Sequence, residues 1–193
     1  MTAPLVFAYG SLVSRTSVVQ TLGEPVEVIA EARLRGWRRR WSTVRNNRAS
    51  EKSFAPAGGG NPFRYCLGLN IEPDPGAPGP NGVLLRITGA QLERLDLREL
   101  RYDRVDVTDA VDGAGPTGSG VIAYAAKPRH HGPSPPPGAV ILGSYVRAVE
   151  SAFEQLGRRA LEVYRATTQP HPVDVVEGVL VDFDAPPGNP RAW

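Results

Sequence analysis

The segment Phe7–Leu12, FAYGSL, ends an apolar run on a glycine and a serine close to the start of the sequence. Leu5–Tyr9 is apolar and partly β-branched or aromatic, so it predicts a short buried strand that stops at Gly10. Two interpretations fit this pattern. The segment is either a plain turn from strand to loop, or a loop that presents backbone N–H groups to a ligand. The rest of the sequence has to decide between them.

The composition narrows the class of protein. With 193 residues, 41% of them hydrophobic and 22% charged, the chain fits one globular domain. A net charge of +2 gives no general reason to expect binding to nucleic acid or to a membrane. The single cysteine, Cys66, fits a reducing compartment, and neither a signal peptide nor a membrane-spanning run is evident. We therefore expect a cytoplasmic protein.

Hydrophobic periodicity predicts a mixed α+β domain that spans residues 1–193. Two loop-rich segments, 46–62 and 127–138, and a tail at 184–193 interrupt the pattern. Thr88 and Gln91 have the spacing of a helix capping box. Strands are expected at 5–9, from 26 onward, at 65–71, 83–87, 102–107, 121–126 and 175–183, and helices at 14–22, 88–100, 140–156 and 159–167.

The common catalytic motifs are missing. Ser11 lies outside a G-x-S-x-G elbow, and Cys66 sits in the middle of a predicted strand, where a structural role is the simpler interpretation. Neither a Walker A motif nor a dinucleotide fingerprint occurs. One cysteine and three histidines make a poor set of metal ligands. We therefore expect no cofactor and no metal.

A second block, LDLRELRYDRVDV at Leu95–Val107, helps to decide how FAYGSL is interpreted. Together the two blocks resemble the γ-glutamylcyclotransferase superfamily, which has a strand ending in Y-G-S-[LN] and, downstream, G-V-strand-T-x-x-x-L-x-x-L-D-x-x-E followed by a Tyr and a strand. The resemblance runs from Leu5 to about Thr168. Many members place Gly after the Glu, where this chain has Leu100. The matching residues are Tyr9, Gly10, Ser11, Leu12, Gly82, Val83, Thr88, Leu92, Leu95, Asp96, Glu99, Tyr102 and Val105.

The resemblance implies a single-domain γ-glutamylcyclotransferase-like fold, with a mixed β-barrel or sheet flanked by helices. It also implies a reaction in which the α-amine of a γ-glutamyl compound attacks its own γ-amide carbonyl, giving 5-oxoproline and a released amine without a cofactor. Glu99 would carry the proton, and burial beside the predicted helix would desolvate it. The N–H groups of Gly10, Ser11 and Leu12 would face the carbonyl oxygen, with the Tyr9 ring as a wall. Tyr102 would pack beside the Glu99 carboxyl, or it is a core aromatic.

Several alternatives remain open. Glu99 can instead be a solvated residue at a helix end, paired with Arg98, Arg101 or Arg104. A non-catalytic member of the fold that binds a small acid or a partner protein is a second possibility. The substrate is also undecided among glutathione, γ-glutamyl amino acids, γ-glutamylamines and γ-glutamyl-protected metabolites, as are the oligomeric state and a role of segment 46–62 as a lid.

The basic stretch RLRGWRRRWSTVR, residues 33–45, has to be explained as well. Most of its arginines fit the exposed face of a strand, but we expect Arg38 or Arg40 to point inward and bind the α-carboxylate of the substrate. An alternative is a nucleic-acid-binding module, in which arginines contact phosphates and Trp37 and Trp41 stack on bases. The low net charge disfavours that alternative.

Overall fold

A computed structural model describes residues 5–112 and 120–184. Of the predicted tail at 184–193, all but Asp184 lies outside the described residues. The helices are α1 (Arg15–Leu22), α2 (Gly89–Arg98), α3 (Gly143–Leu156) and α4 (Arg158–Thr167), and the strands are β1 (Leu5–Ala8), β2 (Glu27–Leu34), β3 (Trp37–Asn46), β4 (Lys52–Pro56), β5 (Tyr65–Pro73), β6 (Asn81–Arg86), β7 (Tyr102–Asp106), β8 (Val111–Asp112), β9 (Val121–Ala126), β10 (Ala139–Leu142), β11 (Val175–Val176) and β12 (Gly178–Phe183).

The six-stranded sheet, in the order β7-β9-β1-β6-β2-β8, has β1, the strand that leads into FAYGSL, near its middle. β1 runs antiparallel to β6, with Phe7 opposite Leu84, and parallel to β9. All four residues of β1 are buried. Because successive side chains of a strand point to opposite faces, both faces of the sheet are covered at this point. β1 is therefore a rigid base for the loop that follows it.

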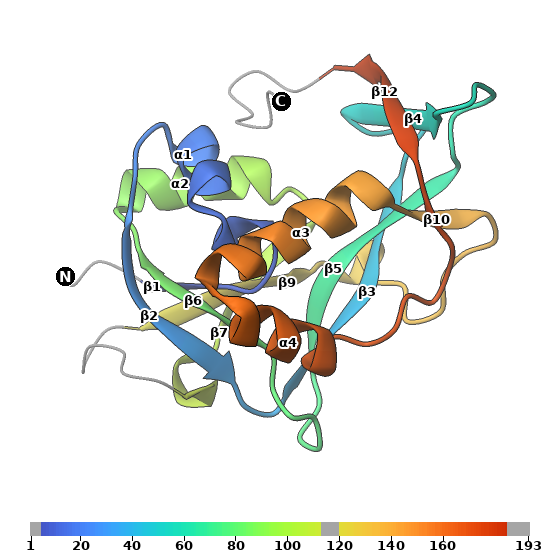
Figure 1. Cartoon of the computed structure of the whole chain (residues 1–193). Coiled ribbons are helices and arrows are strands. Elements are labelled where there is room, and N and C mark those ends of the chain that lie inside the picture. The colour runs from blue at the N-terminus through green and yellow to red at the C-terminus, as the bar shows by residue number, and fades with distance from the viewer. Residues whose placement is uncertain (1–4, 113–119, 185–193) are drawn as a thin grey trace.

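A second sheet, β11-β10-β5-β3, lies beside the first, and a separate ribbon pairs β12 with β4. Figure 1 shows α1 and α2 side by side at one end of the six-stranded sheet, while α3 and α4 form a pair in front of the strands. The sheets curl around one continuous hydrophobic core that includes residues of β1, β5, β6, β9 and α3. The predicted α+β class is confirmed.

The predicted capping box is confirmed and explains where α2 begins. The Thr88 hydroxyl accepts a hydrogen bond from the N–H of Gln91, and the Gln91 side chain accepts one from the N–H of Thr88. These two bonds satisfy donors that a helix start leaves without partners. Leu95, on the apolar side of α2, is fully buried. The helix ends at Glu99, its C-terminal capping residue.

Two predictions of local structure are wrong. Segment 46–62 is not loop throughout, because Lys52–Pro56 forms β4, which pairs with β12 near the other end of the chain. Residues 140–142 are not helical, because they belong to β10, which pairs with β5 and β11, and α3 starts only at Gly143. In both places the strand is fixed by a partner remote in sequence, which local periodicity does not reveal.

Gly82 allows β1 and β6 to approach closely. A Cβ added there would collide with the carbonyl oxygen of Ala8 and lie 2.9 Å from Cζ of Phe7. We expect Gly82→Ala to lower the free energy of unfolding by about 1–3 kcal/mol or more, because the backbone of β1 cannot move away without disrupting the core. Denaturant unfolding measures this loss. The control is Gly89→Ala, where an added Cβ meets nothing within 4 Å, and an equal effect of both substitutions would contradict the prediction.

Candidate active site

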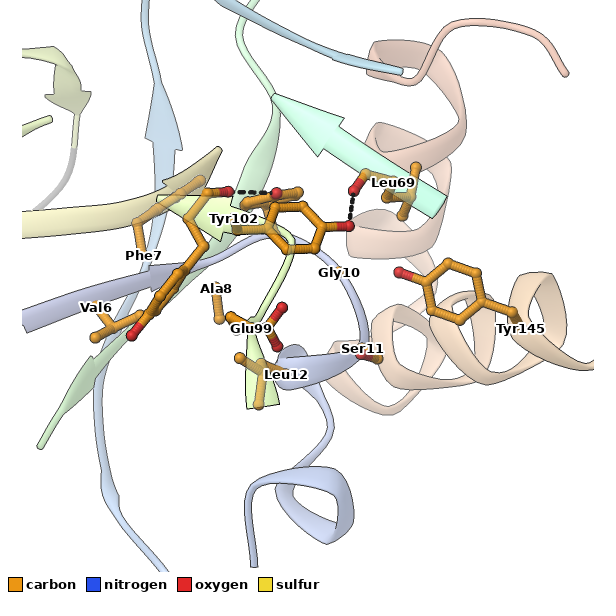
Figure 2. Close-up of a pocket in the computed structure, with 12 residues that line it drawn as sticks. Val6, Phe7, Ala8, Gly10, Ser11, Leu12, Leu69, Glu99, Tyr102 and Tyr145 are labelled. Atoms are coloured by element: carbon orange, nitrogen blue, oxygen red, sulfur yellow. Dashed lines mark hydrogen bonds between the residues drawn. The ribbon is translucent and has the colours of Figure 1, made fainter. Parts of the chain in front are cut away.

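A tight turn joins α2 to β7 and holds Glu99 in place. The N–H of Glu99 donates to the carbonyl of Leu95 at 2.8 Å, and the N–H of Tyr102 donates to the carbonyl of Glu99 at 2.8 Å. The first bond ends the helix and the second closes the turn that starts the strand. As a result, the Glu99 carboxyl lies next to the Tyr102 ring, as Figure 2 shows.

The loop after β1 faces the same place. Tyr9 and Gly10 lead into a short 3-10 turn, Ser11–Val13, whose first bond runs from the N–H of Val13 to the carbonyl of Gly10 at 3.0 Å. The N–H groups of Gly10, Ser11 and Leu12 precede that bond, so the turn itself cannot satisfy them. Gly10 has φ of −136° and ψ of −135°, and a Cβ there would meet Leu69 and Tyr145 only at van der Waals distance. Gly10 therefore matters because its missing side chain leaves open the space beside Leu69 and Tyr145.

A cavity of about 50 Å³ separates this loop from Glu99. The side chain of Glu99 is only 11% exposed, so the alternative of a solvated helix-end residue does not hold. Figure 2 shows the carboxyl between the first loop and the Tyr102 ring. Residues from both sequence blocks and from three further elements line the cavity, namely Val6, Phe7, Ala8, Tyr9, Gly10, Ser11, Leu12, Leu69, Glu99, Tyr102, Tyr124 and Tyr145.

Arg98 contacts residues of both sequence blocks. Its Nε lies 3.1 Å from Oε1 of Glu99, and its Nη2 donates to the hydroxyl of Ser11 at 2.9 Å. Further hydrogen bonds reach Ser17 and Thr21 of α1. The guanidinium is almost entirely buried. The alternative of a solvated Glu99 also named Arg98 as a possible partner. In the structure, however, Arg98 holds the Glu99 carboxyl against the first loop. Sequence reasoning named Arg98 only as one possible partner of Glu99 and missed its contact with Ser11, since an arginine before a helix end is common.

Four tyrosines, Tyr9, Tyr102, Tyr124 and Tyr145, line the cavity together with Glu99. Tyr9 donates to the carbonyl of Tyr124 at 2.6 Å, and Tyr102 donates to the carbonyl of Leu69 at 2.8 Å. Burial, followed by the neighbouring Tyr102, raises the pKa of Tyr9 well above its ordinary value, so it stays a neutral donor. Tyr145 reaches the cavity from α3, with its hydroxyl turned toward the other residues drawn in Figure 2. Sequence reasoning missed it, because its helical spacing with core residues explains it equally well.

The prediction that Arg38 or Arg40 points into the site is wrong. Both side chains contact the Glu72 carboxylate, at 3.2 Å and 3.4 Å, and neither lines the cavity. Strand alternation places Arg39 on the opposite face, where it is fully buried. Trp41 is also buried and packs edge-on against the Tyr145 ring, so it is not exposed for stacking on a base.

A second, larger cavity of about 330 Å³ adjoins the first. The two share Ser11, Glu99, Tyr102 and Tyr145 as lining residues. Across the described residues, no group of three or more His, Cys, Asp or Glu side chains is arranged to hold a metal ion. Nor does residue range 5–112 or 120–184 contain a helix long and apolar enough to cross a membrane.

Comparison with solved structures identifies the fold. The chain is similar to a structure named gamma-glutamyl cyclotransferase, with a TM-score of 0.58 and 17% identity over 91% of this chain and 94% of that one. It is similar to an uncharacterized protein from Homo sapiens (TM-score 0.58, 18% identity, 92% and 95% covered). YkqA from Bacillus subtilis gives a TM-score of 0.56 at 18% identity, covering 88% of this chain and 57% of that one.

No family model matches the sequence, and no curated protein matches it at the level of sequence. At the identities found, the structural likeness shows the fold alone. The chain therefore has the γ-glutamylcyclotransferase-like fold that its two sequence blocks predict.

Proposed function

We propose that the chain is a cofactor-independent γ-glutamylcyclotransferase, which cyclises the γ-glutamyl group of a small compound to 5-oxoproline and releases an amine. One observation carries the proposal. The largely buried carboxyl of Glu99 and the loop Gly10–Leu12 line the same small cavity, although they are far apart in the sequence. The fold shared with a structure named gamma-glutamyl cyclotransferase supports it.

The cavity suits a reaction within a single molecule. The α-amine and the γ-carbonyl of a glutamyl group belong to one substrate, so the protein has only to hold the folded conformer in which they touch. Correct orientation of two such groups contributes up to about 7–11 kcal/mol to the lowering of a barrier. Walls formed by Leu12, Leu69 and the rings of Tyr102 and Tyr145 leave little room for an extended conformer.

Glu99 accounts for both proton transfers. Its carboxylate removes a proton from the α-ammonium group, and the freed amine attacks the γ-carbonyl carbon, forming the new C–N bond of the ring. The protonated carboxyl then gives this proton to the departing nitrogen as the original amide bond breaks. The second proton that the ring nitrogen must lose passes to the released amine, which departs as an ammonium ion. A positioned acid–base group of this kind accelerates a reaction by about 10²- to 10⁴-fold. No other co-reactant is required, and the atoms balance as 5-oxoproline plus the free amine.

The first loop supplies hydrogen-bond donors for the negative charge that develops on the γ-carbonyl oxygen. As the amine adds, the carbonyl oxygen becomes negative, and donors fixed around it stabilise the transition state by about 3–4 kcal/mol for each donor that matters. The N–H groups of Gly10, Ser11 and Leu12 are the donors in the cavity that the 3-10 turn leaves without internal partners. The hydroxyl of Ser11 accepts from Arg98, which holds the loop in this position.

A screen of γ-glutamyl compounds tests the proposal. Purified protein is incubated with γ-glutamyl peptides, γ-glutamyl amino acids and γ-glutamylamines, and 5-oxoproline is detected by mass spectrometry. Release of 5-oxoproline from at least one compound is the expected result. Thermal stabilisation by these compounds without any 5-oxoproline would instead support the non-catalytic member of the fold and contradict the enzyme.

Gly10→Ala tests the fit of the glutamyl group. The added methyl would lie 3.8 Å from both Cδ1 of Leu69 and the hydroxyl of Tyr145, so it enters the small cavity without a clash. We expect kcat/KM for the best γ-glutamyl compound to fall about tenfold or more, by loss of bound substrate or of its orientation. The melting temperature should change little. An unchanged kcat/KM in a folded variant would show that the substrate does not occupy this cavity.

A further inference from the structure

The larger cavity adjoins the smaller one at the residues that would surround the reacting bond. Ser11, Glu99, Tyr102 and Tyr145 line both. A glutamyl group held in the small cavity therefore directs its γ-amide, and the amine beyond it, into the large one. At about 330 Å³ the large cavity has the size of a small-molecule site. The residues that line the large cavity should then indicate which kind of amine the reaction releases.

Much of that lining is apolar. The two strands that local periodicity did not reveal contribute to it, with Phe54 from the ribbon of β4 and β12 and Leu142 from β10. Leu180, on β12, also lines the cavity and is 45% exposed, although it is a large apolar side chain. An apolar wall that stays open to solvent is stabilised by an apolar ligand that covers it. The cavity thus favours an amine with a ring or a branched carbon body.

The polar part of the lining is cationic. Arg45, Lys52 and Arg101 line the cavity, whereas Glu99 is its one carboxylate among the described residues. Arg101 is already paired with the Glu51 carboxylate, at 2.5 Å and 3.0 Å. Lys52 is itself buried. The cationic side of this cavity therefore depends most on Arg45.

Arg45 lies between the apolar and the cationic parts of the cavity. Its guanidinium stacks over the Phe54 ring, 5.1 Å from the centroid, and donates to Oδ1 of Asn47 at 3.2 Å. Within the described part of the chain, no carboxylate lies at ion-pair distance from it. Burial lowers the pKa of Arg45 and the neighbouring Arg101 adds to this effect, whereas a hydrogen bond with the Cys66 thiol and the charge of Glu51 act in the opposite direction. An anion bound here would offset both the desolvation and the repulsion between the two guanidinium groups.

We propose that the leaving amine has an apolar, preferably aromatic, body that ends in an anionic group, and that Arg45 binds this group while Phe54 and Leu142 contact the body. The inference rests on the proposed function, since it assumes that a glutamyl group fills the small cavity. Its chemical class is an aromatic amino acid or aminobenzoate-like amine joined to glutamate through the γ-amide. The competing assignment is that Arg45 binds the α-carboxylate of the glutamyl group itself.

Binding to the Glu99→Gln protein tests the inference without turnover. The probes are γ-glutamyl-para-aminobenzoate, the neutral γ-glutamyl-para-aminobenzamide of the same shape, and γ-glutamylglycine, each titrated by calorimetry. We expect the aminobenzoate to bind at least about tenfold more tightly than the aminobenzamide, as for a charge-assisted contact. γ-Glutamylglycine should bind more weakly than either, because it leaves the apolar wall uncovered.

Adding Arg45→Gln should abolish the preference for the aminobenzoate while leaving the affinity of the aminobenzamide within about twofold. Arg45→Lys should restore part of the preference. Arg64→Gln is the control, because Arg64 is an exposed arginine that precedes β5 and lies outside the cavity lining. It should leave all three affinities unchanged.

Equal binding of aminobenzoate and aminobenzamide by the protein with Arg45 intact would overturn the inference, even if Arg45→Gln proves unable to fold. A loss of equal size for all three probes on Arg45→Gln would overturn it too, in favour of the glutamyl α-carboxylate. A clear preference for the aminobenzoate without any 5-oxoproline release by the protein with Glu99 would leave this inference standing and contradict only the proposed reaction.

Discussion

Replacing Glu99 by glutamine is expected to lower the rate of 5-oxoproline release by at least about 10²- to 10⁴-fold. The amide has nearly the shape of the carboxyl, but it can neither take the proton of the α-ammonium group nor return it to the leaving nitrogen. The fold should persist, because Arg98 keeps its hydrogen bonds to Ser11 and Thr21 when the ion pair with Glu99 is lost. Steady-state kinetics and circular dichroism measure the two effects.

The matched control is Glu93→Gln, an exposed position on the same helix. It removes the same charge from α2 without touching the cavity, so its kcat should equal that of the original protein. A Glu99→Gln variant with undiminished kcat would remove Glu99 from the mechanism. A variant that fails to fold would show that the carboxyl is a structural partner of Arg98 instead.

Arg39→Met is expected to lower the free energy of unfolding by about 3–5 kcal/mol. The Arg39 guanidinium is fully buried and donates to the carbonyls of Tyr9 and Asn81 at 2.9 Å and 2.8 Å. It also donates to groups at the end of α4 and lies 4.4 Å from the centroid of the Tyr164 ring. Methionine would leave these buried acceptors without a donor, at about 1–3 kcal/mol each, partly offset by removal of a buried charge.

Burial lowers the pKa of Arg39 to about 9, so the group remains charged at neutral pH. Arg38→Met is the matched control. Arg38 is the neighbour of Arg39 in the sequence, its side chain is 34% exposed, and its ion pair with Glu72 should contribute no more than about 1 kcal/mol to stability. Urea unfolding of both variants gives the comparison. Equal losses would mean that burial of Arg39 does not hold the end of β1, the start of β6 and the end of α4 together.

The sequence sufficed where structure is set by neighbours along the chain. The capping box at Thr88 and Gln91 placed the start of α2, and the fixed spacing from there placed Glu99 at its end. The strand Leu5–Ala8 followed from its apolar run, and its central position in the sheet gives the following loop a fixed base. These two local features, with the resemblance to a known superfamily, brought the carboxyl and the loop into one predicted site.

The sequence did not suffice where distant partners decide. β4 exists because β12, far along the chain, pairs with it, and β4 has no strong period of its own. Arg38, Arg39 and Arg40 are chemically identical, and only the register of β3 against β5 decides which one is buried. Tyr145 carries no local sign that it lines the same cavity as Glu99, because α3 reaches the cavity through tertiary packing alone.

The most direct test of the central claim is the identity of the product formed in ¹⁸O-labelled water. Attack by the α-amine within the cavity beside Glu99 predicts 5-oxoproline that contains no label, released together with the free amine. Glutamate that carries the label would mean that water is the nucleophile, and would contradict the account of this site.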